Sequence, residues 1–406
     1  MALGGFFASV TGMEAQSQAM QSVSMNIANM TTTGYKSNET MFQTLLGSWP
    51  TVKNNSSGLS SSRTDISGVS AYDRTNILQQ GNVASTGRNY DVAINRQNAF
   101  FMVRDGYDNV YYSRAGNFGT LTEDGTTYLV NSSNLKVQGF SALPGGGFSS
   151  TPSDIEMPGT DKIPSVQTSA IEITANVPAS DVTSSSYGLT VYGPNNDGQT
   201  MNMIFKKVEG NVNTWDVSFN MDDATVSSAP IQVVFGNNGE VLSPKNFDIA
   251  VNWNDGSQNN VAIDISKMTQ YDGSNTIKNI SQDGKASGNF LKSYIDDDGV
   301  LKASYTNGQV VDYAKLTLVG FSSPENLTNV TGTLFQAGAG TGDSYYVMGY
   351  DTADKTIVSA QSLESSTVNP EKEFSKMITV QRAYSMNSQT FTVNNEMLST
   401  IVDLKS

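Results

Sequence analysis

Residues 2–30 read ALGGFFASVTGMEAQSQAMQSVSMNIANM, and this stretch decides how the whole chain is organised. It contains an apolar side chain at every seventh position: Phe6, Met13, Met20 and Ile27. A strict seven-residue apolar repeat is typical of a helix that packs along a neighbouring helix. Leu3 and Val10 begin a second, parallel stripe that becomes polar further along. We therefore predict a long N-terminal helix that needs a partner, ended by the β-branched residues 31–33 and Gly34.

The C-terminal end repeats the pattern. Asn369 can cap a helix, and Pro370 suits the first helical position. The seven-residue stripe that follows consists of Met377, Tyr384, Phe391 and Leu398, and Phe374 and Val402 add apolar ends to a second stripe. We expect these twelve side chains of the two helices to make the contacts by which copies of the chain assemble.

The middle of the chain reads as β-structure. Nine Asn-Gly or Asp-Gly dipeptides mark tight turns. Residues 215–221 and 247–253 alternate between apolar and polar side chains, as half-buried strands do. Asp296–Gly299 lacks the ligand spacing of a calcium loop, so we interpret it as the turn of a hairpin between residues 290–295 and 300–305.

A β-rich middle between two matching helices predicts a nested architecture. Five of the eleven prolines lie between Pro144 and Pro178, which is typical of a domain crossing. The fold class is mainly β with a terminal α-helical coiled coil. The expected domains are a helical one (residues 1–35 and 365–406), a linker (36–71), a middle β domain (72–169 and 284–364) and an inserted outer β domain (170–283). Within the linker we expect a helical turn at residues 41–46 and an extended stretch from 53 to 70.

Composition excludes several functions. The 406 residues contain no Cys and no His, which argues against triad catalysis, the usual zinc sites and any enzyme activity. We expect no cofactor and no metal. The net charge of −14 disfavours nucleic acid, and no apolar segment predicts membrane insertion. The first basic residue is Lys36, so a cleaved secretory signal is not expected, and the chain is either cytosolic or exported without one.

Short motifs at both ends resemble those of the flagellar axial proteins, the family of basal-body rod and hook subunits. Near the N-terminus these are Asn26-Ile27-Ala28-Asn29 and Gly34-Tyr35-Lys36, and near the C-terminus Gln381-Arg382 and Asn394-Asn395. Residues 86–94 and 112–118 resemble a further shared block, although Asn95 and Ala99 stand where the family usually has Gly. The resemblance covers about residues 1–140 and 285–406. The large central insert favours the hook subunits of this family over the rod subunits.

The resemblance implies a structural protein of the bacterial flagellum. Such a subunit forms a homopolymer, a curved helical tube that acts as a universal joint and transmits torque from rod to filament. It is exported through the flagellar type III apparatus without a cleaved signal peptide and becomes part of the extracellular hook. Its implied partners are the rod, the hook cap and the hook–filament junction proteins.

Two alternatives remain at this point. One is a distal rod-type subunit of the same family. The other is a secreted β-rich adhesin or carbohydrate-binding protein, which would leave the two terminal heptad patterns unexplained.

Overall fold

The computed structural model describes residues 2–46, 66–159, 162–179, 184–194, 198–211, 213–222, 224–227, 229–347 and 357–403. The chain forms two compact units. One consists of residues 1–158, 293–302 and 312–406, and the other of residues 159–292 and 303–311. The chain thus passes several times between the units. The domain boundaries expected from sequence stay a prediction.

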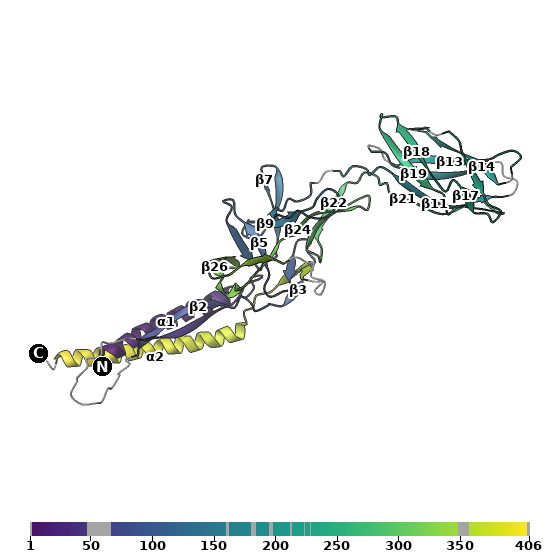
Figure 1. Ribbon diagram of the computed structural model, residues 1–406. Coiled ribbons are helices and arrows are strands. Elements are labelled where there is room, and N and C mark those ends of the chain that lie inside the picture. The colour runs from purple at the N-terminus through teal and green to yellow at the C-terminus, as the bar shows by residue number, and fades with distance from the viewer. Residues whose placement is uncertain are drawn as a thin grey trace, which may run out of the picture. The chain divides into compact units, whose positions relative to one another are not determined.

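Two long helices lie at the ends of the chain, α1 (Ala2–Ala28) and α2 (Pro370–Asp403), and they pack side by side (Figure 1). The predicted start of α2 is confirmed, because the Asn369 side chain accepts a hydrogen bond from the Lys372 amide at 3.1 Å. The helix expected over residues 2–30 ends two residues earlier, at Ala28. Gly34 lies six residues beyond this end; it has a φ of +67°, and an added Cβ would be 2.6 Å from the backbone nitrogen of Ala115.

The segment after α1 forms a hairpin rather than the predicted helical turn. Strands β1 (Asn38–Leu46) and β2 (Ile66–Thr75) pair antiparallel, with Asn38 opposite Thr75. The hairpin packs along α1, where the Val69 amide donates to the Thr11 hydroxyl at 3.2 Å. The apolar spacing of residues 41–46 fits a helical period, and pairing with a distant strand overrode it. Of the stretch predicted to be extended, residues 53–65 lie outside the described part of the chain.

A 13-stranded sheet contains most strands of the first unit. Its central strands run in the order β24-β9-β5-β6-β27-β26, and a 3₁₀ turn, η1 (Pro324–Asn326), precedes β26. The strands of this sheet are β5 (Phe100–Arg104), β6 (Val110–Ser113), β7 (Gly119–Glu123), β8 (Thr126–Val130), β9 (Lys136–Ser141), β10 (Ser153–Asp154), β22 (Phe290–Ile295), β23 (Val300–Tyr305), β24 (Val310–Leu316), β25 (Leu318–Phe321), β26 (Thr328–Thr331), β27 (Leu334–Gln336) and β28 (Ser344–Tyr346). The predicted hairpin at Asp296–Gly299 is confirmed, with Gly299 at a φ of +72°.

Two short strand pairs connect this core to residues 358–364, the segment just before α2. Strand β3 (Val83–Ser85) pairs with β30 (Ser362–Glu364), and β4 (Val92–Ile94) pairs with β29 (Val358–Ala360). The C-terminal segment therefore returns to the β core immediately before it enters α2. Buried aliphatic and aromatic side chains such as Phe101, Val137 and Leu316 fill the core.

The second unit is a sandwich of two sheets. One has the order β15-β18-β19-β11-β20, with β21 on β11, and the other β12-β13-β14-β16-β17. The strands are β11 (Ala170–Pro178), β12 (Ser184–Val191), β13 (Gln199–Lys207), β14 (Thr214–Met221), β15 (Ala224–Ser227), β16 (Ile231–Phe235), β17 (Val241–Ser243), β18 (Asn246–Trp253), β19 (Gln258–Asp264), β20 (Thr269–Tyr271) and β21 (Thr276–Gln282). The two alternating stretches are confirmed as strands β14 and β18, which bury Trp215 and Trp253 in the shared core.

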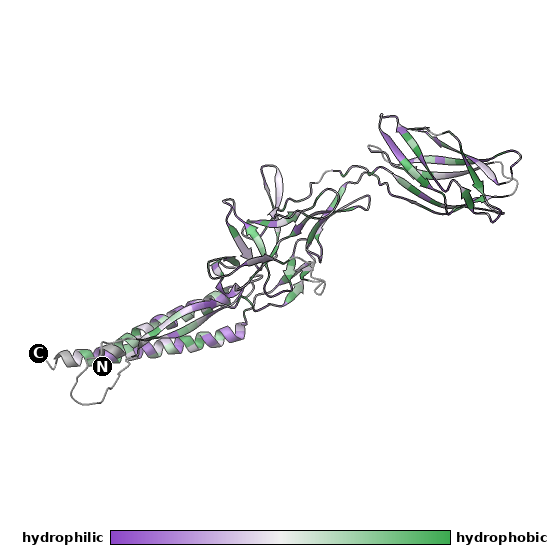
Figure 2. Ribbon diagram, in the orientation of Figure 1, coloured by the Kyte–Doolittle hydropathy of each residue, from purple (hydrophilic) through white to green (hydrophobic). Residues whose placement is uncertain are grey.

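The molecule is thus mainly β, with two terminal helices that pack together, as the sequence predicted. Apolar positions gather on the strands of both units, whereas both helices carry mixed colours (Figure 2). Within the described ranges, neither helix is long and apolar enough to cross a membrane.

Candidate assembly site

The contact between α1 and α2 begins with small side chains on α1. The side chains of Ser9, Ala15 and Ala19 are buried, and Gly12 lies so close to α2 that an added Cβ would be 2.8 Å from the Asn387 amide nitrogen. Small residues let two helix backbones approach closely. Most buried residues of α1 are therefore small, whereas its methionine stripe is only half-buried.

Larger side chains meet near the free ends of the helices. The rings of Phe6 and Phe391 lie with their centroids 4.7 Å apart. One turn further along α2, the Asn394 amide donates to the Ser9 hydroxyl at 3.4 Å. Two stripe residues, Phe6 and Phe391, and one signature residue, Asn394, thus take part in contacts between opposite ends of the chain.

The predicted assembly stripes are only partly covered within one chain. Three stripe residues are exposed, Val10, Phe374 and Tyr384. Seven are half-buried: Phe6, Met13, Met20, Ile27, Met377, Phe391 and Leu398. The side chains of Leu3 and Val402 lie outside the described part of the molecule. A single chain does not test whether these residues are buried in an assembly, so that role stays a prediction.

Asn26 is the buried polar centre where α1, the hairpin and α2 meet. Its side-chain oxygen accepts hydrogen bonds from the Asn38 amide (2.9 Å) and the Tyr35 hydroxyl (3.2 Å). Its side-chain nitrogen donates to the Asn38 carbonyl (2.8 Å) and to Glu373 Oε2 on α2 (3.2 Å). All four bonds of this fully buried amide are made within the protein. Burial and the Glu373 carboxylate both raise the pKa of Tyr35, which keeps its hydroxyl a donor.

A second, charged cluster lies where the chain has left α1 and where it is about to enter α2. The Glu364 carboxylate on β30 contacts Lys36 Nζ at 2.7 Å and Arg114 Nε at 2.6 Å, and all three side chains are at most 1% exposed. It also accepts a hydrogen bond from the Gly81 amide at 2.8 Å. Burial alone would raise the pKa of Glu364, but Arg114 and Lys36 hold it below its usual range. Burial lowers the pKa of Lys36, and Glu364 only partly offsets this.

The other signature residues lie either near the end of α1 or on the surface of the two helices. Gly34, Tyr35 and Lys36 lie in the segment between α1 and β1. The side-chain amide of Asn29 donates to the Met25 carbonyl near the end of α1. Gln381, Arg382 and Asn395 are exposed on α2, as is Ala28 on α1. The structure thus divides the N-terminal signature between two buried clusters and the surface of α1, and leaves most of the C-terminal signature on the surface of α2.

Sequence reasoning missed Glu364 and Glu373. A signal for Glu364 was present, because it is the single charged residue between Lys355 and Glu371. An isolated charge in such a neutral segment is a candidate for a buried ion pair.

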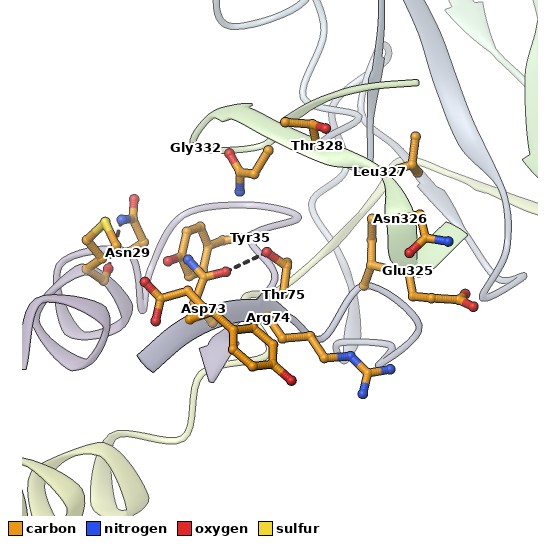
Figure 3. A pocket seen from close by; sticks show the side chains of 15 residues that line it. Asn29, Tyr35, Asp73, Arg74, Thr75, Glu325, Asn326, Leu327, Thr328 and Gly332 are labelled. Carbon is orange, nitrogen blue, oxygen red and sulfur yellow. Dashed lines mark hydrogen bonds between the residues drawn. The ribbon is translucent and has the colours of Figure 1, made fainter. Parts of the chain in front are cut away.

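A cavity of about 790 Å³ lies between the end of α1, strand β2 and the segment from η1 to β26. Figure 3 shows Tyr35, Asp73 and Arg74 on one side of it and Glu325, Asn326 and Leu327 on the other. Its lining mixes acidic, basic, amide and apolar groups. Within the described residues, no group of three His, Cys, Asp or Glu side chains could hold a metal ion.

Three family models match the chain. Two match the terminal segments that contain the helices, and the third matches residues of the second unit. The model "Flagella basal body rod protein" matches residues 8–36, and "Flagellar basal body rod FlgEFG protein C-terminal" matches residues 359–404. The model "Flagellar basal body protein FlaE D2 domain" matches residues 160–285.

Similar proteins extend over almost the whole chain. Flagellar hook proteins FlgE are 28% identical in Brucella suis, 27% in Salmonella typhimurium and 26% in Escherichia coli. Each match covers 98% of this chain and 97–100% of the relative. The crystal structure of the Helicobacter pylori flagellar hook protein FlgE2 shares the fold, with a TM-score of 0.50 and 12% identity over 70% of this chain and 99% of that one.

The paired terminal helices and the two terminal family models define the class: this is an axial protein of the bacterial flagellum. The model that matches residues 160–285 and the full-length relatives narrow the assignment. The chain belongs to the flagellar hook protein family and is a structural subunit of the hook.

Proposed function

We propose that this subunit polymerises into a curved helical tube and works as a universal joint that transmits torque from rod to filament. The main support is an apolar surface on α2 that stays largely exposed in the described part of the single chain. Its side chains are 47–63% exposed: Phe374, Ile378, Met386, Val393 and Met397. At 100° per residue these positions fall within an arc of about 140°. Residues that meet α1, such as Asn387 and Phe391, project from the opposite side of the helix.

An exposed apolar surface of this kind marks a contact with another protein. In a homopolymer the natural occupant is the terminal helix of a neighbouring copy, which offers the same surface. The family supports this reading, because the relatives that match over their full length are hook proteins. The rod-type and adhesin alternatives are not favoured by these matches.

The remaining expectations from sequence complete the proposal. The chain has no enzyme activity and uses no cofactor. It is exported through the flagellar type III apparatus without a cleaved signal. It contacts the rod, the hook cap and the hook–filament junction proteins at the ends of its polymer.

Polymerisation of purified chain, viewed by negative-stain electron microscopy, tests this function. Wild-type protein should give curved tubes. A Met386→Glu/Met397→Glu variant should give none, because each charge would have to be desolvated in the contact. The matched variant Met386→Leu/Met397→Leu keeps the apolar area and should still polymerise. Tubes from the glutamate variant would show that this face of α2 is not an assembly contact.

A further inference from the structure

We infer that Arg382 of one subunit forms an ion pair with Glu14 of a neighbouring copy in the assembled tube. The outer face of α2 then packs on the outer face of the neighbour's α1. This contact rests on the polymerisation proposed above, and it identifies the surface that covers the exposed apolar arc of α2. The pair belongs to the assembled subunit, so neither helix needs to be ordered in the free chain.

Arg382 is an isolated charge on an apolar surface. It is the single charged side chain between Met377 and Asn395. At about 100° per residue it projects near the middle of the exposed apolar arc of α2. Its side chain is exposed, and it has no ion-pair partner among the described residues. A subunit that covers this arc takes water from the guanidinium, which is strongly unfavourable without a counter-charge. The covering surface therefore has to supply a carboxylate.

The outer face of α1 has the matching composition. Phe7, Val10 and Met25 are 57%, 36% and 38% exposed, and they fall within an arc of about 60°. Glu14 lies inside this arc, is exposed, and is the single charged side chain in residues 2–35. In the described part of the chain it too makes no ion pair. Each outer face thus combines an apolar surface with one charge, and the two charges are opposite in sign.

Both charges point away from the contact between the two helices of one subunit. Within that contact, Gly12 of α1 lies opposite Asn387 of α2. Glu14 projects about 160° around α1 from Gly12, and Arg382 projects about 140° around α2 from Asn387. Because the helices run antiparallel, Glu14 and Arg382 are offset by only about 4.5 Å along the helix pair (Figure 1). They therefore lie at similar heights on opposite outer sides of the pair.

This placement prevents the ion pair within one subunit and favours it between neighbours. When helix pairs stand side by side in the same orientation, α2 of one copy meets α1 of the next. Arg382 then faces Glu14, and the apolar side chains around both exclude water, which strengthens their attraction. A contact between two different surfaces repeats from copy to copy and builds rings or helical tubes rather than closed dimers.

Charge reversal in the full-length chain tests the pair, with polymerisation of purified protein measured by sedimentation at low ionic strength. Arg382→Glu and Glu14→Arg should each raise the protein concentration needed for polymerisation about tenfold or more, because like charges then meet. The double variant Glu14→Arg/Arg382→Glu restores the pair with its signs inverted. It should return that concentration to within about threefold of wild type.

The matched control is Glu371→Arg/Arg382→Glu, which has the same net charge as the double variant. Glu371 is exposed in the first turn of α2, so this control does not restore the pair and should not rescue polymerisation. The thermal unfolding transition of each variant should match wild type, which excludes misfolding of the β units as the cause.

Three results would each overturn the ion pair: single reversals that polymerise like wild type, a double variant no better than the single reversals, or rescue by the Glu371 control. Wild-type chain in the same assay separates the pair from the proposed function. Tubes from wild type without rescue by the double variant would contradict the pair alone.

Discussion

The rings of Phe6 and Phe391 lie 4.7 Å apart, centroid to centroid, with an angle of 40° between their planes. Phe6 is in the second turn of α1, and Phe391 is in the C-terminal half of α2. The first and last segments of the chain therefore meet through members of the two seven-residue stripes that the sequence displays. This contact is the structural basis for the first prediction.

A double-mutant cycle on this pair should show a coupling energy of about 1 kcal/mol, the usual worth of an aromatic pair beyond its buried area. Phe6→Leu and Phe391→Leu keep most of the apolar volume and remove the ring contact. The measurement is the free energy of opening of α1, from native-state hydrogen exchange. Phe7 is 57% exposed and serves as the control, since Phe7→Leu should show no coupling to Phe391.

Leu398→Asp should abolish swimming while both β units still fold. Leu398 is half-buried in the single chain, and we expect it to lie in a packed contact of the assembled tube. A carboxylate there should cost several kcal/mol, on the order of other buried unpaired charges. Swim-plate assays and electron microscopy of isolated hooks measure the effect, with Leu398→Met as the apolar control. Normal hooks from the aspartate variant would contradict the predicted role of this stripe.

Gly34→Ala should destabilise the segment between α1 and β1 far more than Gly87→Ala destabilises its own surroundings. Both glycines have positive φ, +67° and +71°, so each variant bears the strain of a left-handed residue, about 1 kcal/mol. A Cβ on Gly34 would also lie 2.6 Å from the Ala115 nitrogen, whereas a Cβ on Gly87 meets nothing within 4 Å. We expect a total of ~3 kcal/mol or more at Gly34. Urea titration followed by limited proteolysis of the N-terminal segment should rank the variants; equal effects would rule out the contact with Ala115.

Acid should open the junction between the helices and the β core. The pKa of Glu364 is lower in the folded chain than in the unfolded chain, so its contribution to stability is fully present above the ordinary carboxyl range. That contribution is lost as the pH falls through the lower, folded pKa. Protease sensitivity of α1 measured from neutral pH downwards should therefore rise at a pH below the usual glutamate value. The difference between wild type and Glu364→Gln should shrink over the same interval, and a constant difference would contradict this assignment.

Replacing residues 170–283 by a short Gly/Ser bridge should leave the first unit folded. The ends of the deleted segment lie close together, since the Asp283 carboxylate accepts a hydrogen bond from the Ser169 amide at 2.8 Å. Tubes should still form through the terminal helices, but they should be straight or fragile. The reason is that curvature of a tube needs contacts at the largest radius, where we expect the inserted domain to lie. Electron microscopy and swimming assays measure both outcomes; curved, functional hooks would refute this role, and an unfolded chain would refute the boundary.

The repeats at Phe6–Ile27 and Met377–Leu398, the cap at Asn369 and the alternation around Trp215 and Trp253 are local patterns. Each specifies a helix or a strand through the period of its own side chains, so the sequence was enough to predict these elements. The class of protein also followed from short motifs such as Asn26–Asn29 and Gly34–Lys36, which stand contiguously in the chain.

Contacts between segments that are distant in the sequence could not be predicted from local patterns, and only the tertiary structure determines them. The hairpin of β1 and β2 depends on pairing across a long connection, so the apolar residues around Phe42 alone could not exclude a helical turn. Gly34 was interpreted as a helix end, but its closest constraint is the backbone of Ala115, far along the chain, which leaves no room for a side chain. Lys36, Arg114 and Glu364 are so far apart in the sequence that no local pattern predicts their charged cluster. Its members meet because burial of the β core brings three separate segments together, and a buried charge is tolerated only where such partners converge.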